Sequence, residues 1–186
     1  AENLFLHRRW SGSGLDGWIE AHKPEQTIRI GDTDPNENYR IGKTFPDLEV
    51  QISGKAQRLS ELEGTLVIDL WASWCAPCMK ALPHINDLAE AYEGTGITIV
   101  AVSVDRERAD ARRALKSLDT PQFVSAWAGR EAMDQAHVKS IPSVFIVDEN
   151  LEILSYFNGY TDGDTRIEDK LDALLEKKAQ SLEERP

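Results

Sequence analysis

The sequence predicts an α/β fold in which a central mixed sheet carries helices on both faces, preceded by an N-terminal extension. Apolar runs typical of strands alternate with segments long enough for helices. Late in the chain, two apolar runs flank the turn Asp-Glu-Asn at residues 148–150, which predicts an antiparallel hairpin. We therefore expect a sheet that is mostly parallel early in the chain and antiparallel late.

The first predicted elements are two strands and a helix. Residues 48–52 alternate between apolar and polar side chains, which predicts a short strand. Residues 65–71 are almost continuously apolar, as expected of a strand buried on both faces. A helix-like stretch covers residues 76–92, and the glycines Gly94 and Gly96 end it.

The second half of the chain continues this alternation. Residues 97–104 form another apolar strand, and residues 106–118 read as an exposed helix rich in Arg and Asp. The last predicted helix is amphipathic, with Ile167 and Leu171 among the apolar residues of one face. The remaining expected elements are strands at 122–125, 143–147 and 152–157 and helices at 130–137 and 165–178.

These elements place the folded domain at residues 42–178. Residues 1–41 mix Gly, Ser, Asp, Asn and Pro with scattered aromatic residues. We expect an extension that packs these aromatic residues on the domain, and a partner-docking arm is the alternative. Residues 179–186 are polar and are expected to fray as a C-terminal tail.

The charge balance disfavours nucleic-acid binding. The formal net charge is −11, whereas a nucleic-acid-binding protein carries a basic face. No run approaches the ~18 apolar residues of a membrane span. Residues 1–10 lack the apolar stretch of a secretory leader, which is equally compatible with a leader that was removed and with one that never existed.

The two cysteines of the chain, Cys75 and Cys78, lie between a predicted strand and a predicted helix. A helix N-terminus favours negative charge, and the thiolate is the nucleophilic form of cysteine. We therefore predict that Cys75 is a partly exposed nucleophile and that Cys78 is a more buried resolving thiol. Pro77 suits the first helical turn, where a missing N–H costs nothing.

An inert buried pair and half of a zinc site are the alternatives for these two cysteines. A structural zinc ion needs two further ligands at suitable spacing, and the four histidines of the chain form no pair. We expect neither a metal nor a bound cofactor, because the cysteine pair itself would carry the electrons.

Residues 69–78, together with Pro83, resemble the thioredoxin superfamily. Four framing segments are similar to its TlpA/ResA/CcmG-like branch, within the redoxin and AhpC/TSA grouping. The resemblance covers roughly residues 42–178 and implies a thioredoxin-like three-layer fold. The framing segments are residues 42–48, 59–64, 100–105 and 141–148.

The resemblance also implies the other half of the site. The peptide bond before Pro142 is expected to be cis and to lie beside the cysteines, with the backbone of Ile141 open to pairing with a substrate segment. Trp74, Ala76 and Pro77 are expected to contact partners. Trp71 is expected to belong to the core.

Asp69 matches the buried aspartate of thioredoxins that relays a proton to and from the resolving cysteine. Burial in apolar surroundings would raise its pKa and suit it to acid–base work. Two departures from the family pattern matter here. Thioredoxins carry a lysine opposite this aspartate, where this chain has an uncharged run near Ala101, and the acid that TlpA-like proteins often carry after the second cysteine is replaced by Ala81.

The expected function is thiol–disulfide exchange with protein partners, as a reductant that a further redox partner resets. The branch is mostly periplasmic or otherwise extracytoplasmic in bacteria, so we expect the same location here. Two alternatives remain. A thiol peroxidase would carry Pro-x-x-x-Thr-x-x-Cys, which this chain lacks, and a non-catalytic copper-binding relative would carry Cys-x-x-x-Cys with a distant His.

Overall fold

The computed structural model of the chain describes residues 40–118 and 121–183. The predicted extension, except for its last two residues, lies outside the described residues, as does the end of the predicted tail. Within the described part of the chain, no helix is both long enough and apolar enough to cross a membrane.

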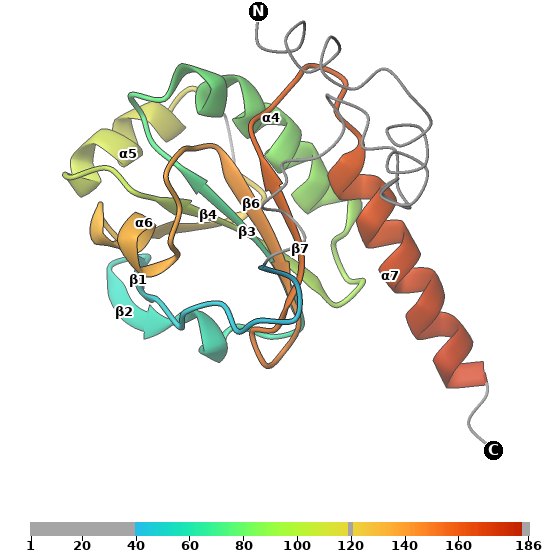
Figure 1. The fold of residues 1–186 in the computed structure, drawn as a ribbon. Helices are drawn as coiled ribbons and strands as arrows, with labels where there is room; N and C mark the ends of the chain where they lie inside the picture. Colours follow the sequence, from blue (N-terminus) through green and yellow to red (C-terminus); the bar gives the residue numbers. More distant parts are fainter. Residues whose placement is uncertain (1–39, 119–120, 184–186) are drawn as a thin grey trace, which may run out of the picture. The chain divides into compact units, whose positions relative to one another are not determined.

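The strands of the described residues form one mixed sheet in the order β2-β1-β5-β4-β3-β6-β7 (Figure 1). The central strands β5, β4 and β3 are parallel, and the pairs at both edges are antiparallel. The strands are β1 (Glu49–Ile52), β2 (Lys55–Arg58), β3 (Thr65–Trp71), β4 (Ile97–Ser103), β5 (Val124–Trp127), β6 (Ser143–Val147) and β7 (Ile153–Asn158).

This topology confirms the mixed sheet but not the expectation that the first strands of the chain are mostly parallel. The sheet is not parallel from its start, because β1 and β2 form a tight hairpin and β1 then pairs antiparallel with β5. Strand β5 also begins two residues later than predicted and runs to Trp127. The parallel part is therefore the centre of the sheet, where strands β3 and β4 are connected through helix α4.

Helices cover both faces of the sheet, as predicted. Helices α4 and α7 lie together on one face and α6 lies on the other (Figure 1). Accordingly, Val144 of β6 lies beside residues of α4, whereas its neighbour Phe145 faces Arg40, which bonds to the end of α6. The helices are η1 (Leu59–Glu61), α4 (Ala76–Ala91), α5 (Arg108–Leu115), α6 (Glu131–Gln135) and α7 (Arg166–Glu183).

Both predicted domain boundaries need correction. Helix α7 continues to Glu183, past residue 178, because no glycine or proline interrupts residues 166–183. At the other end, Arg40 already belongs to the folded domain. Its guanidinium donates hydrogen bonds to the carbonyl oxygens of Ala136 (3.0 Å) and His137 (2.6 Å) and stacks on the ring of Tyr156.

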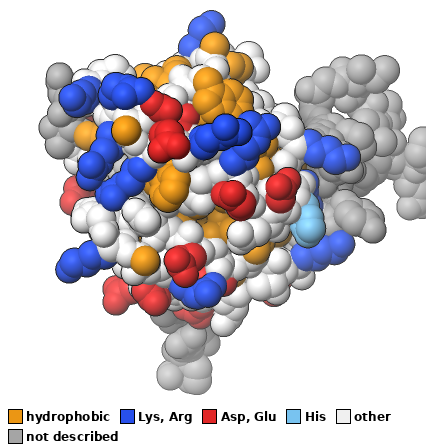
Figure 2. Space-filling view, turned by 90° about the vertical axis from the view of Figure 1, so that its left-hand side faces the viewer, with side chains coloured by type: hydrophobic (Ala, Val, Ile, Leu, Met, Phe, Trp, Pro, Cys, Tyr) orange, Lys and Arg blue, Asp and Glu red, His pale blue; other side chains and the backbone are white. Residues whose placement is uncertain are grey.

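The buried interior follows the predicted pattern. All residues of β3 except the first are buried, and Trp71 is fully enclosed, which confirms it as a core residue. The face seen in Figure 2 mixes Lys and Arg side chains with Asp and Glu around apolar surface. On this face the charges of both signs are interspersed, which fits a solvated surface better than a nucleic-acid footprint.

Two glycines set the entry into β3. Gly64 has φ +82°, and a Cβ added to it would lie 2.3 Å from the carbonyl oxygen of Gly96. The same oxygen accepts a hydrogen bond from the N–H of Thr65, the first residue of β3. The close approach of these two backbones therefore aligns the starts of β3 and β4.

We predict that Gly64→Ala lowers the free energy of unfolding by about 3 kcal/mol, because it adds a backbone clash to the cost of a left-handed conformation. Gly94→Ala is the matched control, since Gly94 also has a positive φ (+72°) but open space around the added Cβ. The control should cost only about 1 kcal/mol. Urea unfolding of both variants measures the difference, and equal losses would contradict this account.

Candidate active site

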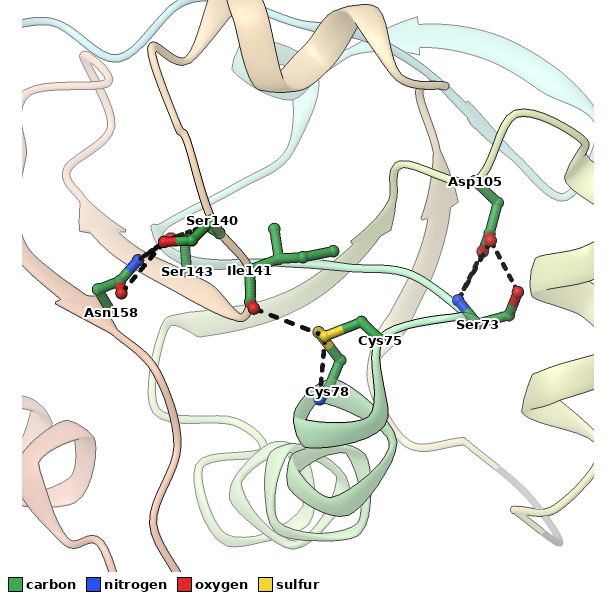
Figure 3. Close-up of a disulfide and its surroundings, with 8 residues drawn as sticks. All are labelled: Ser73, Cys75, Cys78, Asp105, Ser140, Ile141, Ser143 and Asn158. Atoms are coloured by element: carbon green, nitrogen blue, oxygen red, sulfur yellow. Dashed lines mark hydrogen bonds between the residues drawn. A yellow bond between two sulfur atoms is a disulfide. The ribbon is translucent and has the colours of Figure 1, made fainter.

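The cysteine pair lies where β3 passes into α4, as predicted. Cys75 is the N-cap residue of α4, and Cys78 lies in its first turn. The two residues form a disulfide with an S–S distance of 2.06 Å. The backbone N–H of Cys78 donates a hydrogen bond to Cys75 Sγ at 3.2 Å (Figure 3). In the reduced protein, the same N–H and the helix dipole would favour a thiolate on Cys75.

The burial of the two cysteines agrees with the expected order but not with the expected exposure. Cys78 is more buried than Cys75, with exposed fractions of 1% and 6%. Cys75 is therefore nearly enclosed rather than partly exposed. The reason is the loop before β6, whose Ile141 carbonyl oxygen lies 3.6 Å from Cys75 Sγ. The loop is 66 residues away from Cys75 in the sequence; its position beside the cysteines was expected from the resemblance, but the degree of burial was not.

The Ile141–Pro142 peptide bond is cis, in agreement with the expectation from resemblance. Figure 3 shows the Ile141 carbonyl pointing at the disulfide. Side chains that the sequence analysis did not single out hold this loop. The Nδ2 amide of Asn158 donates hydrogen bonds to Ser140 Oγ and Ser143 Oγ, both at 2.9 Å, and the Gly159 N–H donates to the Pro142 carbonyl oxygen at 2.9 Å.

A second brace fixes the residues just before Cys75. The buried carboxylate of Asp105 accepts hydrogen bonds from the N–H and the hydroxyl of Ser73, the latter at 2.7 Å (Figure 3). It also accepts one from Ser103 Oγ at 2.9 Å. Asp105 and Ser73 follow the parallel strands β4 and β3, whose carboxyl ends meet at one edge of the sheet. This shared edge is the signal from which the contact could have been predicted.

The predicted partner-contacting residues surround the disulfide at the surface. Trp74 is 59% exposed, and Ala76 and Pro77 are exposed at the start of α4. Ile141 is half-buried beside them. An exposed tryptophan next to a nearly enclosed sulfur offers apolar contact area to a docking segment.

Asp69 is buried in the middle of β3, with 1% of its surface exposed. The residues paired with Asp69 on the neighbouring strands are Ala101 on β4 and Val144 on β6. Neither is charged, so the lysine that thioredoxins carry opposite this aspartate is absent, as expected. Its Oδ1 atom has no hydrogen-bond partner among the described residues. Burial without a compensating charge raises the pKa of Asp69 to about 7.

The structure places Asp69 beside the proline loop. Asp69 lines a cavity of about 10 Å³ together with Pro142 and Ala81, and neither cysteine is part of its lining. Ala81 thus occupies the position after the second cysteine where an acid would have faced Asp69. As for metal binding, the described residues contain no cluster of three or more His, Cys, Asp or Glu side chains that could hold an ion.

Comparison with known proteins agrees with this site. Residues 41–156 match the AhpC/TSA family. The chain belongs to that family. It is 31% identical to the thiol-disulfide oxidoreductase ResA of Oceanobacillus iheyensis over 132 residues, which cover 68% of this chain and 69% of ResA. The expected resemblance to the TlpA/ResA/CcmG-like branch is thereby confirmed.

Solved structures of other proteins superpose on this AhpC/TSA-family chain. A protein of Chlorobium tepidum, assigned as the thiol:disulfide interchange protein DsbE, superposes with a TM-score of 0.66 at 27% identity and covers 73% of this chain and 97% of its own. StoA of Bacillus subtilis superposes with a TM-score of 0.53 at 22% identity and covers 66% and 92% of the two chains. The thioredoxin-like fold is confirmed.

Burial of Asp69 makes the stability of the protein depend on pH. The pKa of its carboxyl rises from 3.8 to about 7 on folding, so the folded state retains a proton that the unfolded chain has released. The free energy of unfolding therefore falls as pH rises from about 4 to about 7, by at most about 4 kcal/mol, and stays low at higher pH.

Asp69→Asn removes this contribution. We predict that the variant gains stability relative to the parent as pH rises over this range. Urea unfolding of both proteins at about pH 5 and about pH 8 measures the change. A stability difference that is the same at both values would contradict the assignment of the raised pKa to Asp69.

Proposed function

We propose that this protein is a thiol–disulfide oxidoreductase that uses Cys75 and Cys78 to reduce disulfides of protein partners. The observation that carries the proposal is the hydrogen bond from the Cys78 N–H to Cys75 Sγ at the N-terminus of α4. In the reduced protein this hydrogen bond would stabilise a thiolate on Cys75 next to a second thiol, which is what disulfide exchange requires. The family and the similarity to ResA support the same activity.

The reaction begins with the protein in its dithiol form. The Cys75 thiolate attacks one sulfur of the partner disulfide, forming a mixed disulfide and releasing the other partner sulfur as a thiolate. Cys78 then loses its proton and attacks Cys75 Sγ, which restores the Cys75–Cys78 disulfide and frees the second partner sulfur. The two partner thiolates take up two protons, and two electrons have passed from this protein to the partner.

The flanking residues have distinct roles in this proposal. Asp69 accepts the proton of Cys78, a task for which a pKa of about 7 is suited near neutral pH. The backbone of Ile141 pairs with an extended segment of the partner, next to the sulfur to be attacked. Trp74, Ala76 and Pro77 form the surface on which that segment rests, and Pro142 positions Ile141.

The proposal includes no bound cofactor, because the disulfide itself stores the electron pair. A separate redox partner returns Cys75 and Cys78 to the dithiol after each cycle. The reductive direction and an extracytoplasmic location in a bacterial envelope are proposed from the resemblance to the TlpA/ResA/CcmG-like branch.

We predict that Cys78→Ser traps partners as mixed disulfides on Cys75, because the serine hydroxyl cannot complete the exchange. Covalent adducts that disappear on reduction should be visible on non-reducing gels after the reduced variant is mixed with a disulfide-bonded model protein. Cys75→Ser is the matched control and should form far fewer adducts, since the remaining sulfur is almost fully enclosed. Equal trapping by the two variants would contradict the assigned roles.

A further inference from the structure

His84 connects the neighbourhood of Asp69 with the protein surface. It follows Pro83 in helix α4 and faces helix α7, where its Nε2 lies 3.2 Å from Oε1 of Glu168. The side chains of His84 and Glu168 are 23% and 27% exposed. Nε2 itself is closed off from solvent, so the exposed fraction belongs to the rest of the ring. The imidazole therefore reaches from the interior to solvent.

His84 and Asp69 line the same cavity. Its volume of about 10 Å³ suits a single water molecule. The wall between the two residues is mainly apolar and includes Val144 and Phe157. A water molecule held in this cavity would connect the Asp69 carboxyl with the His84 imidazole.

The other titratable groups around the cavity are less suited to carry this proton. Asp164 is held by Arg166, whose Nε and Nη2 donate hydrogen bonds at 2.8 and 2.7 Å and lower the pKa of the Asp164 carboxyl. Burial and nearby carboxylates raise the pKa of Tyr160 above its ordinary value, so its phenol keeps its proton near neutral pH. Histidine is the side chain that ordinarily changes charge between roughly pH 5 and 8.

We propose that His84, oriented by Glu168, exchanges the proton of Asp69 with solvent through one water molecule during each round of disulfide exchange. The proposal rests on the function proposed above and adds a residue to it. His84 acts through Asp69 and touches neither sulfur, so it is a positioning and proton-exchange residue rather than a catalytic one. Family resemblance does not point to it, because its contacts depend on where α7 packs.

The proton balance is simple. When Cys78 attacks Cys75 Sγ, its proton passes to the Asp69 carboxylate, which becomes neutral. The carboxylic acid then passes a proton to the water, the water passes one to His84, and the imidazolium beside the Glu168 carboxylate releases it to solvent. No electrons move in these steps, and each group returns to its starting state before the next cycle.

The test uses the full chain, reduced beforehand and mixed with a disulfide-bonded model peptide. Oxidation of the protein is followed by tryptophan fluorescence, since Trp74 lies next to the disulfide. We expect His84→Ala to slow the second step at neutral pH by about tenfold, less than the ~10²–10⁴-fold typical of a direct proton-transfer group. Added imidazole should restore the rate in proportion to its concentration, whereas the parent should not respond to it.

Two further variants separate proton exchange from packing. His84→Gln keeps a polar side chain beside Glu168 but cannot carry a proton at neutral pH, so it should be as slow as His84→Ala. His137→Asn replaces an exposed histidine outside the cavity, with an amide that tolerates the φ of +53° at that position, and should react at the parental rate. The first step, measured as mixed-disulfide formation in the Cys78→Ser background, should be unaffected by His84→Ala.

Each result has a definite meaning. Parental rates in both His84 variants, a slow rate that imidazole does not raise, or a slowed first step would each overturn the role of His84. A parent protein that fails to oxidise in the presence of the peptide would instead overturn the proposed function, whatever the variants do. The two failures are therefore distinguishable in one set of measurements.

Discussion

The active-site geometry depends on the placement of one sulfur at the N-terminus of one helix. Strand β3 ends at Trp71, and four residues later the chain has turned into α4 with Cys75 as its N-cap. The N–H of Cys78 has no partner within the helix, and Cys75 Sγ accepts its hydrogen bond. Any change in the length or angle of this turn would separate the sulfur from the helix dipole that stabilises its anion.

Two braces keep this turn and its cover in place, and each joins parts of the chain that are distant in sequence. Asp105 at the end of β4 holds Ser73, and Asn158 at the end of β7 holds Ser140 and Ser143 beside the proline loop. Because these contacts are made by short polar side chains near buried positions, breaking one leaves buried polar groups without partners. These contacts therefore tie the residues around Cys75 to the segments at the ends of β4 and β7.

The charge state of Asp69 depends on the lack of a cation opposite it in the sheet. Asp69 pairs with Ala101 and Val144 on the neighbouring strands, and among the described residues no charge offsets the cost of burying its carboxylate. Its pKa consequently lies near neutral pH, where a small change in surroundings alters its charge. A group with this property is useful only if its proton can leave, which gives the water-sized cavity and the His84–Glu168 pair their significance.

Much of this protein could be predicted from the sequence because the relevant signals are local. The bounds of β3 match the prediction, since a continuous apolar run followed by a cysteine-capped helix start is encoded within a dozen residues. Family resemblance predicts both the burial of Asp69 and the place of Pro142 beside the cysteines. Less regular segments were predicted less well: α5 is shorter than expected, and α7 is longer.

The sequence by itself thus determined the α/β alternation, the cysteine pair at a strand–helix junction and the missing cation opposite Asp69. Only the tertiary structure decided how little of Cys75 is exposed, that Asp105 and Asn158 hold the site by hydrogen bonds, and that His84 meets Glu168 beside a cavity shared with Asp69. The physical reason is that these contacts join residues up to 84 positions apart, namely His84 and Glu168. Their distances depend on how strands and helices pack, which no short stretch of sequence specifies.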